Sequence, residues 1–192
     1  MLLNPRYGLA AKFFLSDLYG PQDFSSRDEE IERILPMLTS LLPASALQTI
    51  ALAVELDALT EDLDSAMVGE LRKMGRIDAI DEINQINDST YSAAYRAVGR
   101  RPERQRQIAL IRETGEALEK LARKPLLRSV LKLMRGPAHL AGLGCSQAFL
   151  ESGFDAFCKM GEATEFLDAI EGKEQCLLTN LFGGAAQPFD IR

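Results

Sequence analysis

The fold class is decided by residues 44–72, ASALQTIALAVELDALTEDLDSAMVGELR. Apolar residues recur there at intervals of three and four, which is the spacing of one face of an α-helix. Two such faces are present, one through Leu47, Ile50, Ala51, Val54 and Ala58 and one through Leu52, Leu56, Leu59, Leu63 and Met67. A helix that is apolar on two sides is usually buried between neighbours. We therefore predict a central helix over 44–72 with neighbours on both sides.

The segments on either side of 44–72 show the same helical periodicity, and no alternating strand pattern persists. Further helices are predicted from Pro5, after a capping box at Ser26, and over 77–86, 91–98, 102–123 and 126–136, with two more in the last third. The length of 192 residues fits one domain with a sizeable core. We predict an all-α, single-domain bundle of about seven to ten helices over 1–182, with a short C-terminal tail over 183–192.

The sequence has no run of eighteen apolar residues, so no membrane-spanning helix is expected. Its three cysteines, Cys145, Cys158 and Cys176, are odd in number and form no C-x-x-C motif, which argues against a disulfide framework or a zinc site. We expect them to be buried, reduced thiols. The N-terminus lacks the ordered parts of a signal peptide. These features together predict a cytoplasmic protein.

Charge is distributed very unevenly along the chain. The net charge is −6, yet residues 100–135 hold 11 basic and only 4 acidic side chains, and residues 123–135 contain no acid at all. Lys124, Arg128, Lys132 and Arg135 are spaced so that they line one face of a helix. We expect the apolar residues of the same segment on the opposite face, namely Leu126, Leu127, Val130, Leu131, Leu133 and Met134. The pattern is that of a basic amphipathic helix.

This basic segment is the candidate binding site of the sequence. The residues proposed to contact an anionic ligand or an acidic protein surface are Arg100, Arg101, Arg104, Lys124, Arg128, Lys132 and Arg135. In the alternative interpretation, these cations pair with the chain's own acidic segments, at about 0–1 kcal/mol for each surface pair, and need no partner. Both interpretations stay open at this point. A sequence pI of about 5.0 argues against strong binding to duplex nucleic acid.

Evidence for an enzyme is sparse. The chain has no P-loop, G-x-G-x-x-G, H-E-x-x-H or G-x-S-x-G motif, and its one histidine, His139, excludes a multi-histidine metal site. Glu55 and Asp62, with His139, are the residues that an enzyme of this sequence would use. We favour a non-enzymatic protein and predict no catalytic residue, cofactor or metal.

Two further interactions are predicted as alternatives. The phenylalanines of the C-terminal third could line a pocket for an apolar molecule such as a lipid or haem, which is the alternative function. On the first helix, Leu9 and Phe13 lie off the main apolar face. We expect them either to contact a second copy of the chain or to pack under the loop over 19–24.

Phe13–Ser25, with the sequence FFLSDLYGPQDFS, resembles the opening of a family of helical proteobacterial proteins of unknown function. Tyr91–Arg96 and the stretch from Phe154 to Glu174 resemble later segments of that family. The resemblance implies a bacterial, cytoplasmic and helical protein, and it assigns no activity or site residue.

Residues 10–34 also resemble, superficially, the start of the TetR-type repressors. Where the recognition helix of those repressors should follow, this chain has the apolar, proline-broken segment Leu35–Leu38, and its first third is acidic. A recognition helix needs cations near the DNA phosphates. We therefore do not expect sequence-specific DNA binding.

Overall fold

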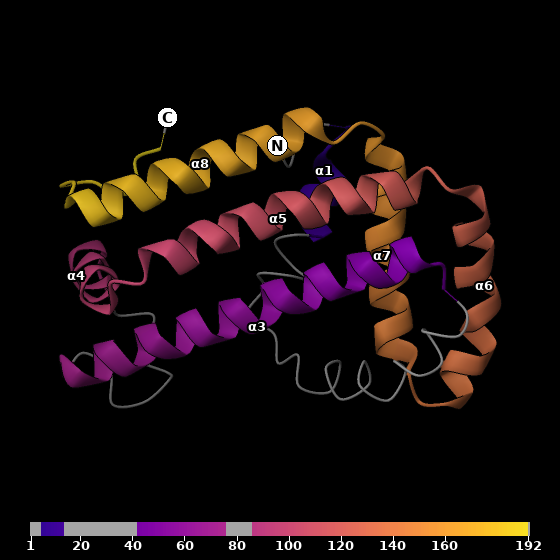
Figure 1. The fold of residues 1–192 in the computed structure, drawn as a ribbon, viewed down its shortest axis with the longest axis horizontal. Coiled ribbons are helices and arrows are strands. Elements are labelled where there is room, and N and C mark those ends of the chain that lie inside the picture. Colours follow the sequence, from indigo (N-terminus) through magenta and orange to yellow (C-terminus); the bar gives the residue numbers. More distant parts are fainter. Residues whose placement is uncertain (1–4, 14–41, 76–85, 192) are drawn as a thin grey trace. The chain divides into compact units, whose positions relative to one another are not determined.

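The computed structural model describes residues 5–13, 42–75 and 86–191, and it is all-helical over these ranges (Figure 1). The described helices are α1 Gly8–Phe13, α3 Ala44–Lys73, α4 Asp88–Val98, α5 Arg101–Ala122, α6 Pro125–Leu140, α7 Gly144–Met160 and α8 Thr164–Gly183. The predicted all-α class is confirmed. The helix predicted after Ser26 and most of the one predicted over 77–86 lie outside the described residues.

Several helix ends follow the local chemistry that the sequence indicates. Asn87 caps α4, because its side-chain oxygen accepts a hydrogen bond of 2.9 Å from the backbone N–H of Thr90. Gly99 ends the same helix with a φ of 69°, a left-handed conformation that side chains with a Cβ rarely adopt. Asn87 therefore marks the start of α4 and Gly99 its end.

The chain forms two compact units. The first consists of Met1–Ala51 and Thr114–Phe166, and the second of Leu52–Glu113 and Leu167–Arg192. Helices α3, α5 and α8 therefore each contribute residues to both units. The two units are described separately below.

The first unit is organised around α6 and α7, which lie side by side and antiparallel (Figure 1). Leu127, Leu131, Met134 and Ala138 of α6 are buried. Leu127 and Leu131 pack in one cluster with Phe154 of α7, together with Ala46 and Leu121. One face of α6 is therefore buried in the core of the first unit.

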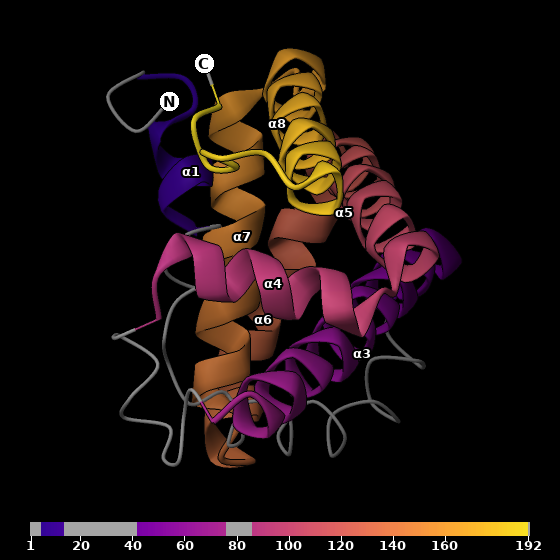
Figure 2. The ribbon, with the colours of Figure 1, turned by 90° about the vertical axis from the view of Figure 1, so that its left-hand side faces the viewer.

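Helix α1 packs on the other side of α7 (Figure 2). The buried ring of Phe13 lies 5.2 Å from the ring of Phe149, measured between centroids. Arg6, just before α1, donates hydrogen bonds to the backbone oxygens of Met160 at 3.0 Å and Glu162 at 2.7 Å. These carbonyls lie at and just beyond the end of α7, where Arg6 supplies donors that the helix lacks.

Helix α6 does not end where the sequence predicts. The sequence predicts an end at residue 136, just before Pro137, but the helix continues through Pro137 to Leu140. Proline removes one backbone hydrogen bond from a helix and crowds the preceding turn. The last turn is held instead by packing, because Ala138 is fully buried in a cluster with Met134 and Leu143.

In the second unit, residues 52–73 of α3 pack with α4, the first half of α5 and most of α8. Their shared core consists of Met67, Leu71, Ala94, Tyr95, Ile108, Leu178 and Leu181. Figure 1 shows α4 nearly end-on while α3 runs across the view, so the two helices cross steeply. Such a crossing lets one short helix contribute to a core built from several longer ones.

The prediction that α3 has neighbours on both sides is wrong around Val54 and Ala58, although Leu47 and Ile50 of the same predicted face pack against a core cluster. Val54 is half-exposed and Ala58 is exposed, so this stretch of α3 has one face toward solvent. Alanine is the best helix former, and exposing its small side chain to solvent costs little free energy. A face rich in alanine therefore satisfies helical periodicity without having to be buried.

The last residues of the chain return to the second unit. Asn180 of α8 donates a hydrogen bond of 3.2 Å to the backbone oxygen of Pro188. The ring of Phe189 lies 5.8 Å from that of Tyr91 in α4. The segment predicted as a short tail after α8 thus makes specific contacts with two helices.

The three cysteines are free, but their predicted burial is wrong for two of them. Cys145 and Cys176 are exposed, and Cys158 is half-buried, with its thiol 3.4 Å from the backbone oxygen of Ala122. Both exposed thiols lie on the solvent side of amphipathic helices. No helix in the described ranges is long and apolar enough to span a membrane.

The contact between α1 and α7 yields a stability prediction. A Cβ added at Gly153 would lie 2.7 Å from Cζ of Phe13, whose ring is buried. Gly153→Ala gains about 1 kcal/mol of helix propensity but overpacks this contact, at a cost of roughly 1–3 kcal/mol. We expect a net loss of stability, measured by thermal unfolding followed by circular dichroism.

Gly172→Ala is the matched control, because Gly172 lies inside α8 and nothing approaches its added Cβ within 4 Å. This control should stabilise the protein by roughly 0.5–1 kcal/mol. Phe13→Leu should rescue part of the loss in Gly153→Ala by shortening the opposing side chain. Equal stabilisation by both alanine substitutions would contradict the described packing of α1 on α7.

Candidate basic interaction site

The basic residues singled out in the sequence divide between the two units. Arg100, Arg101 and Arg104 belong to the second unit, whereas Lys124, Arg128, Lys132 and Arg135 belong to the first. The segment 100–135 therefore supplies two sets of cations.

The arginines at the start of α5 are engaged by their own chain. Arg100 forms ion pairs with Asp62 at 2.7 Å and with Glu103 at 3.2 Å. The hydrogen bond to Asp62, followed by that to Glu103, raises the pKa of Arg100 further above its already high value. Arg101 lies over the ring of Phe182, 5.6 Å from its centroid. This pairing is the arrangement that the alternative interpretation of the basic segment requires.

Arg104 is the most enclosed of the three. It is buried, its guanidinium lies 4.9 Å from the centroid of the Tyr95 ring, and its Nη1 donates to Gln107 at 3.3 Å. Its nearest carboxylate, that of Asp64, is 4.0 Å away. Burial raises the pKa of Tyr95 to about 12, so the ring stays neutral and its face attracts the cation. Arg104 is a core residue of the second unit.

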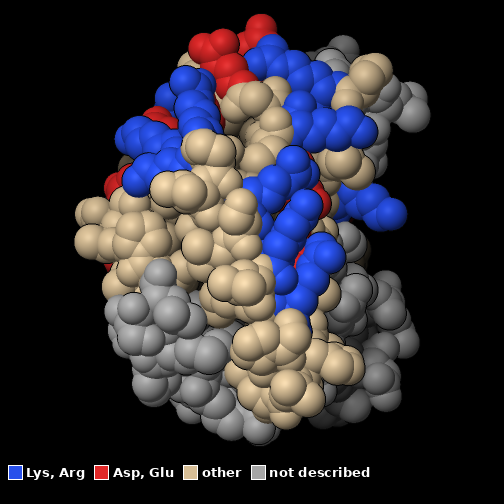
Figure 3. All heavy atoms as spheres, turned by 90° about the vertical axis from the view of Figure 1, so that its right-hand side faces the viewer, with Lys and Arg blue, Asp and Glu red and all other residues tan. Residues whose placement is uncertain are grey.

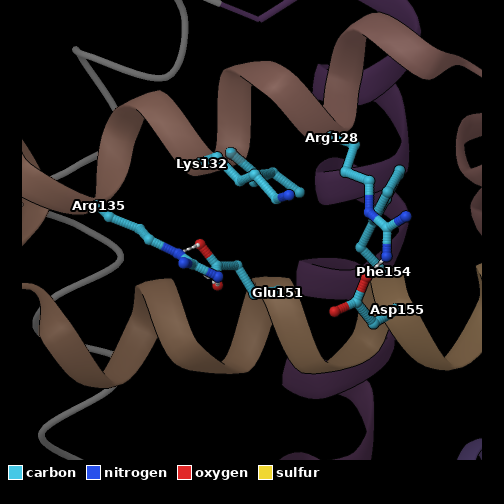
Figure 4. A pocket seen from close by; sticks show the side chains of 7 residues that line it. Arg128, Lys132, Arg135, Glu151, Phe154 and Asp155 are labelled. Atoms are coloured by element: carbon cyan, nitrogen blue, oxygen red, sulfur yellow. Dashed lines mark hydrogen bonds and ion pairs between the residues drawn. The ribbon is translucent and has the colours of Figure 1, made fainter.

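The cations of α6 and its N-cap Lys124 form a second set on one edge of the first unit. Arg128 donates to Asp155 of α7 at 2.7 Å, and Nε of Arg135 donates to the two carboxylate oxygens of Glu151 at 2.6 and 2.9 Å (Figure 4). Lys124 donates to the hydroxyl of Ser45 at 2.8 Å. We call these three residues and Lys132 the cation row.

Lys132 lies between the two paired arginines. Among the described residues, no carboxylate lies within 4 Å of its ammonium group or of that of Lys124. The four cations of the row and the two acids of α7 therefore leave a local excess of two positive charges. The side chains of Arg128 and Arg135 remain 55% and 60% exposed. Ion pairs with α7 thus involve two of the four cations of the row, and the side chains of all four remain exposed to solvent.

The hollow beneath the cation row is shallow. Its lining residues are Arg128, Leu131, Lys132, Arg135, Glu151, Phe154 and Asp155. It encloses about 210 Å³, including space open to solvent. Pockets that bury a drug-sized ligand usually hold roughly 300–1,000 Å³. The hollow therefore suits a surface contact better than an enclosed small molecule.

A row of exposed leucines on α6 was missed by the sequence analysis. Leu127, Leu131 and Met134 are buried as expected, but Leu126 and Leu133 are each 79% exposed and Leu140 is 90% exposed. The expectation that all six apolar residues share the face opposite the cations is therefore wrong. Six residues from 126 to 134 cover too wide an arc to fit one face at roughly 100° per residue. Spacing alone does not separate the exposed leucines, because the buried Leu127 and Met134 are also seven residues apart.

Figure 3 shows the surface on this side of the molecule. Lys and Arg side chains gather in a band, and uncharged surface lies beside it. Acidic side chains are few along the band. This matches the acid-free composition of residues 123–135.

Leu9 and Phe13, the predicted contacts with a second copy, differ in exposure. Phe13 is buried against Phe149 and Gly153 of its own chain, whereas Leu9 is exposed. Only Leu9 thus presents apolar surface for such a contact. The contact itself stays a prediction.

The residues named for an enzyme are also placed. Glu55 accepts two hydrogen bonds from Arg106, at 2.8 and 3.1 Å, and Asp62 pairs with Arg100, both within the second unit. His139 is exposed on α6 of the first unit. Over the described ranges, no cluster of three His, Cys, Asp or Glu side chains could hold a metal ion. Of the C-terminal phenylalanines, Phe154, Phe157 and Phe166 are buried.

A family model matches residues 1–188 of the chain. The chain belongs to the domain of unknown function family DUF8198. No curated protein and no solved structure gives a significant match. The family resemblance expected from Phe13–Ser25 is thus supported as membership of a family of unknown function, and the family description assigns no site to this DUF8198 member.

The pair between Arg135 and Glu151 yields a pH prediction. Hydrogen bonds from Arg135, and then from Gln147, lower the pKa of Glu151 below its ordinary value of 4.5. Because this pKa is lower in the folded chain, the pair stabilises the fold above about pH 4.5. That stabilisation is lost as the pH falls through the folded value. A carboxyl NMR titration of Glu151 should show a midpoint below 4.5.

Arg135→Gln should move this midpoint up toward 4.5. Arg123→Gln removes the same charge from a residue that pairs with Glu119 instead, so the midpoint should stay where it is. A wild-type midpoint at or above 4.5 would show that the pair does not form in solution.

Proposed function

We propose that this protein is a non-catalytic interaction module that binds an anionic ligand or an acidic protein surface through the cation row of α6. One observation carries the proposal. Arg128, Lys132 and Arg135 follow one another at intervals of about one helical turn, and within the described part of the chain carboxylates pair with only two of them, from the α7 side. The positive charge that remains lies on an exposed edge.

The internal ion pairs have two opposite effects on the binding of an anion. Asp155 and Glu151 neutralise part of the charge, which weakens attraction to an anion. They also restrain the guanidinium groups of Arg128 and Arg135, which reduces the side-chain entropy lost on binding. The hydrogen bond between Arg128 and Asp155 uses only Nη2 of an arginine that has five N–H donors.

The shape of the site limits the partner. The hollow is small and open, so contacts have to spread along the row. Such binding is governed by surface charge and weakens as salt is added, because the Debye length falls from about 10 Å at 0.1 M to 3 Å at 1 M. The proposal places the protein in the bacterial cytoplasm, where its three free thiols would stay reduced.

The test is binding to a panel of anions by wild type and by Arg128→Gln/Lys132→Gln/Arg135→Gln. The probes are inorganic phosphate, a single-stranded oligonucleotide, polyglutamate and vesicles of anionic lipid. At least one probe should bind wild type in a salt-dependent manner, and the triple variant should weaken that binding by roughly tenfold or more, about 1.4 kcal/mol.

Two variants separate the site from general charge and from misfolding. Arg72→Gln/Lys73→Gln/Lys173→Gln removes three exposed cations of the second unit and should leave binding within about twofold, since none of the three belongs to the cation row. Lys132→Gln breaks no ion pair among the described residues and should still weaken binding severalfold. Equal losses in both triple variants, or no binding of any probe, would refute the proposal.

A further inference from the structure

The exposed leucines of α6 define the class of partner more narrowly than the cations do. Leu126, Leu133 and Leu140 follow one another at intervals of seven residues, and each is at least 79% exposed. We call them the leucine row. Single exposed apolar side chains are ordinary, but three in register along one helix form a continuous strip.

The two rows occupy different flanks of α6. At roughly 100° per residue, the leucine row lies about 125–165° from the middle of the cation row, and the buried residues occupy the arc on the other side. Ser129 and Gly136 lie between the rows on the outermost line of the helix. The small side chain of Ser129 and the lack of one at Gly136 leave room for another backbone to approach closely.

We propose that the partner of α6 is an amphipathic helix with apolar residues at heptad spacing and acidic residues along one flank. Its apolar residues would pack against Leu126, Leu133 and Leu140, and its carboxylates would reach Lys132 and the exposed sides of Arg128 and Arg135. This inference rests on the proposed function, because it assigns a partner class to the same face.

Charge complementarity selects this occupant. Residues 123–135 carry five cations and no acid, and the acids of α7 offset only part of that charge. The cation row lies about one helix width, roughly 10 Å, from the leucine row, which is comparable to a Debye length. A second copy of α6 on the leucine row would bring two positive clusters together, whereas an acidic helix gains from the same field.

The placement of the leucines also favours a helix over a lipid surface. A flat bilayer would first meet the outermost line of α6, which carries Ser129 and Gly136 rather than leucines. A helix lying alongside α6 can contact the leucine row from the side and the cations across the top. Knobs-into-holes packing uses a repeat of seven, which is the spacing of the row.

The experiment selects binders from a displayed library of single helices. Each member has leucines at heptad positions, and its flanking positions are randomised among Glu, Lys and Gln. The target is the full chain. We expect selected helices to be enriched in Glu on one flank, and the best of them, as synthetic peptides, to bind in a fluorescence anisotropy titration.

Two target variants then locate the contact. Leu126→Gln/Leu133→Gln/Leu140→Gln should weaken peptide binding by about a hundredfold, since it replaces the apolar surface that the leucines of the peptide would bury. This variant should fold as wild type does, because the three side chains are exposed. Leu9→Gln removes an exposed leucine elsewhere in the first unit and should leave binding unchanged.

The remaining outcomes overturn the inference in distinguishable ways. If anions bind through the cation row and the leucine variant behaves like wild type, the proposed function stands and the helix partner is wrong. If neutral or Lys-rich helices are selected, or none is, the acidic flank is wrong. If wild type dimerises in sedimentation velocity and the leucine variant does not, a second copy is the occupant. If anionic vesicles bind and lose that binding with the leucine variant, a lipid surface is the occupant.

Discussion

The rotation of α6 about its own axis is the constraint on which the interaction face depends. Leu127, Leu131 and Met134 are buried, and Gln147 of α7 donates a buried hydrogen bond of 2.7 Å to the backbone oxygen of Leu131. A rotation of α6 by one residue would expose this core row and break the hydrogen bond. These contacts fix the rotation of α6, and the rotation decides which of its remaining positions face solvent. The leucine row is exposed for this reason.

The two sets of arginines come from similar sequence patterns but differ in how far their side chains are buried and paired. At the start of α5, Arg100 meets acids of its own unit and Arg104 is buried over an aromatic ring. On α6, Arg128 and Arg135 meet acids from one side only and stay more than half exposed. Basic residues are dense along the sequence both at the start of α5 and on α6. What differs is whether a packed neighbour covers the side chain.

Local chemistry was readable from the sequence where a few neighbouring residues decide the outcome. The cap at Asn87 and the left-handed Gly99 are of this kind, and so is the i,i+4 pair between Glu119 and Arg123. The helical class follows from periodicity in the same way. The exposed face of α3 at Val54 and the row at Leu126, Leu133 and Leu140 were not readable. Periodicity shows which residues share a face, whereas burial depends on which other helix arrives there.

The proline inside α6 has a consequence for how a partner would find its place. Pro137 has no N–H, so the carbonyl of Leu133, four residues earlier, loses its ordinary helical donor. That oxygen belongs to the middle residue of the leucine row. A partner that covers it must leave a water molecule there or supply a donor of its own. Leucines repeated every seven residues look alike after a shift of one heptad, so this single acceptor distinguishes the correct alignment from the shifted ones.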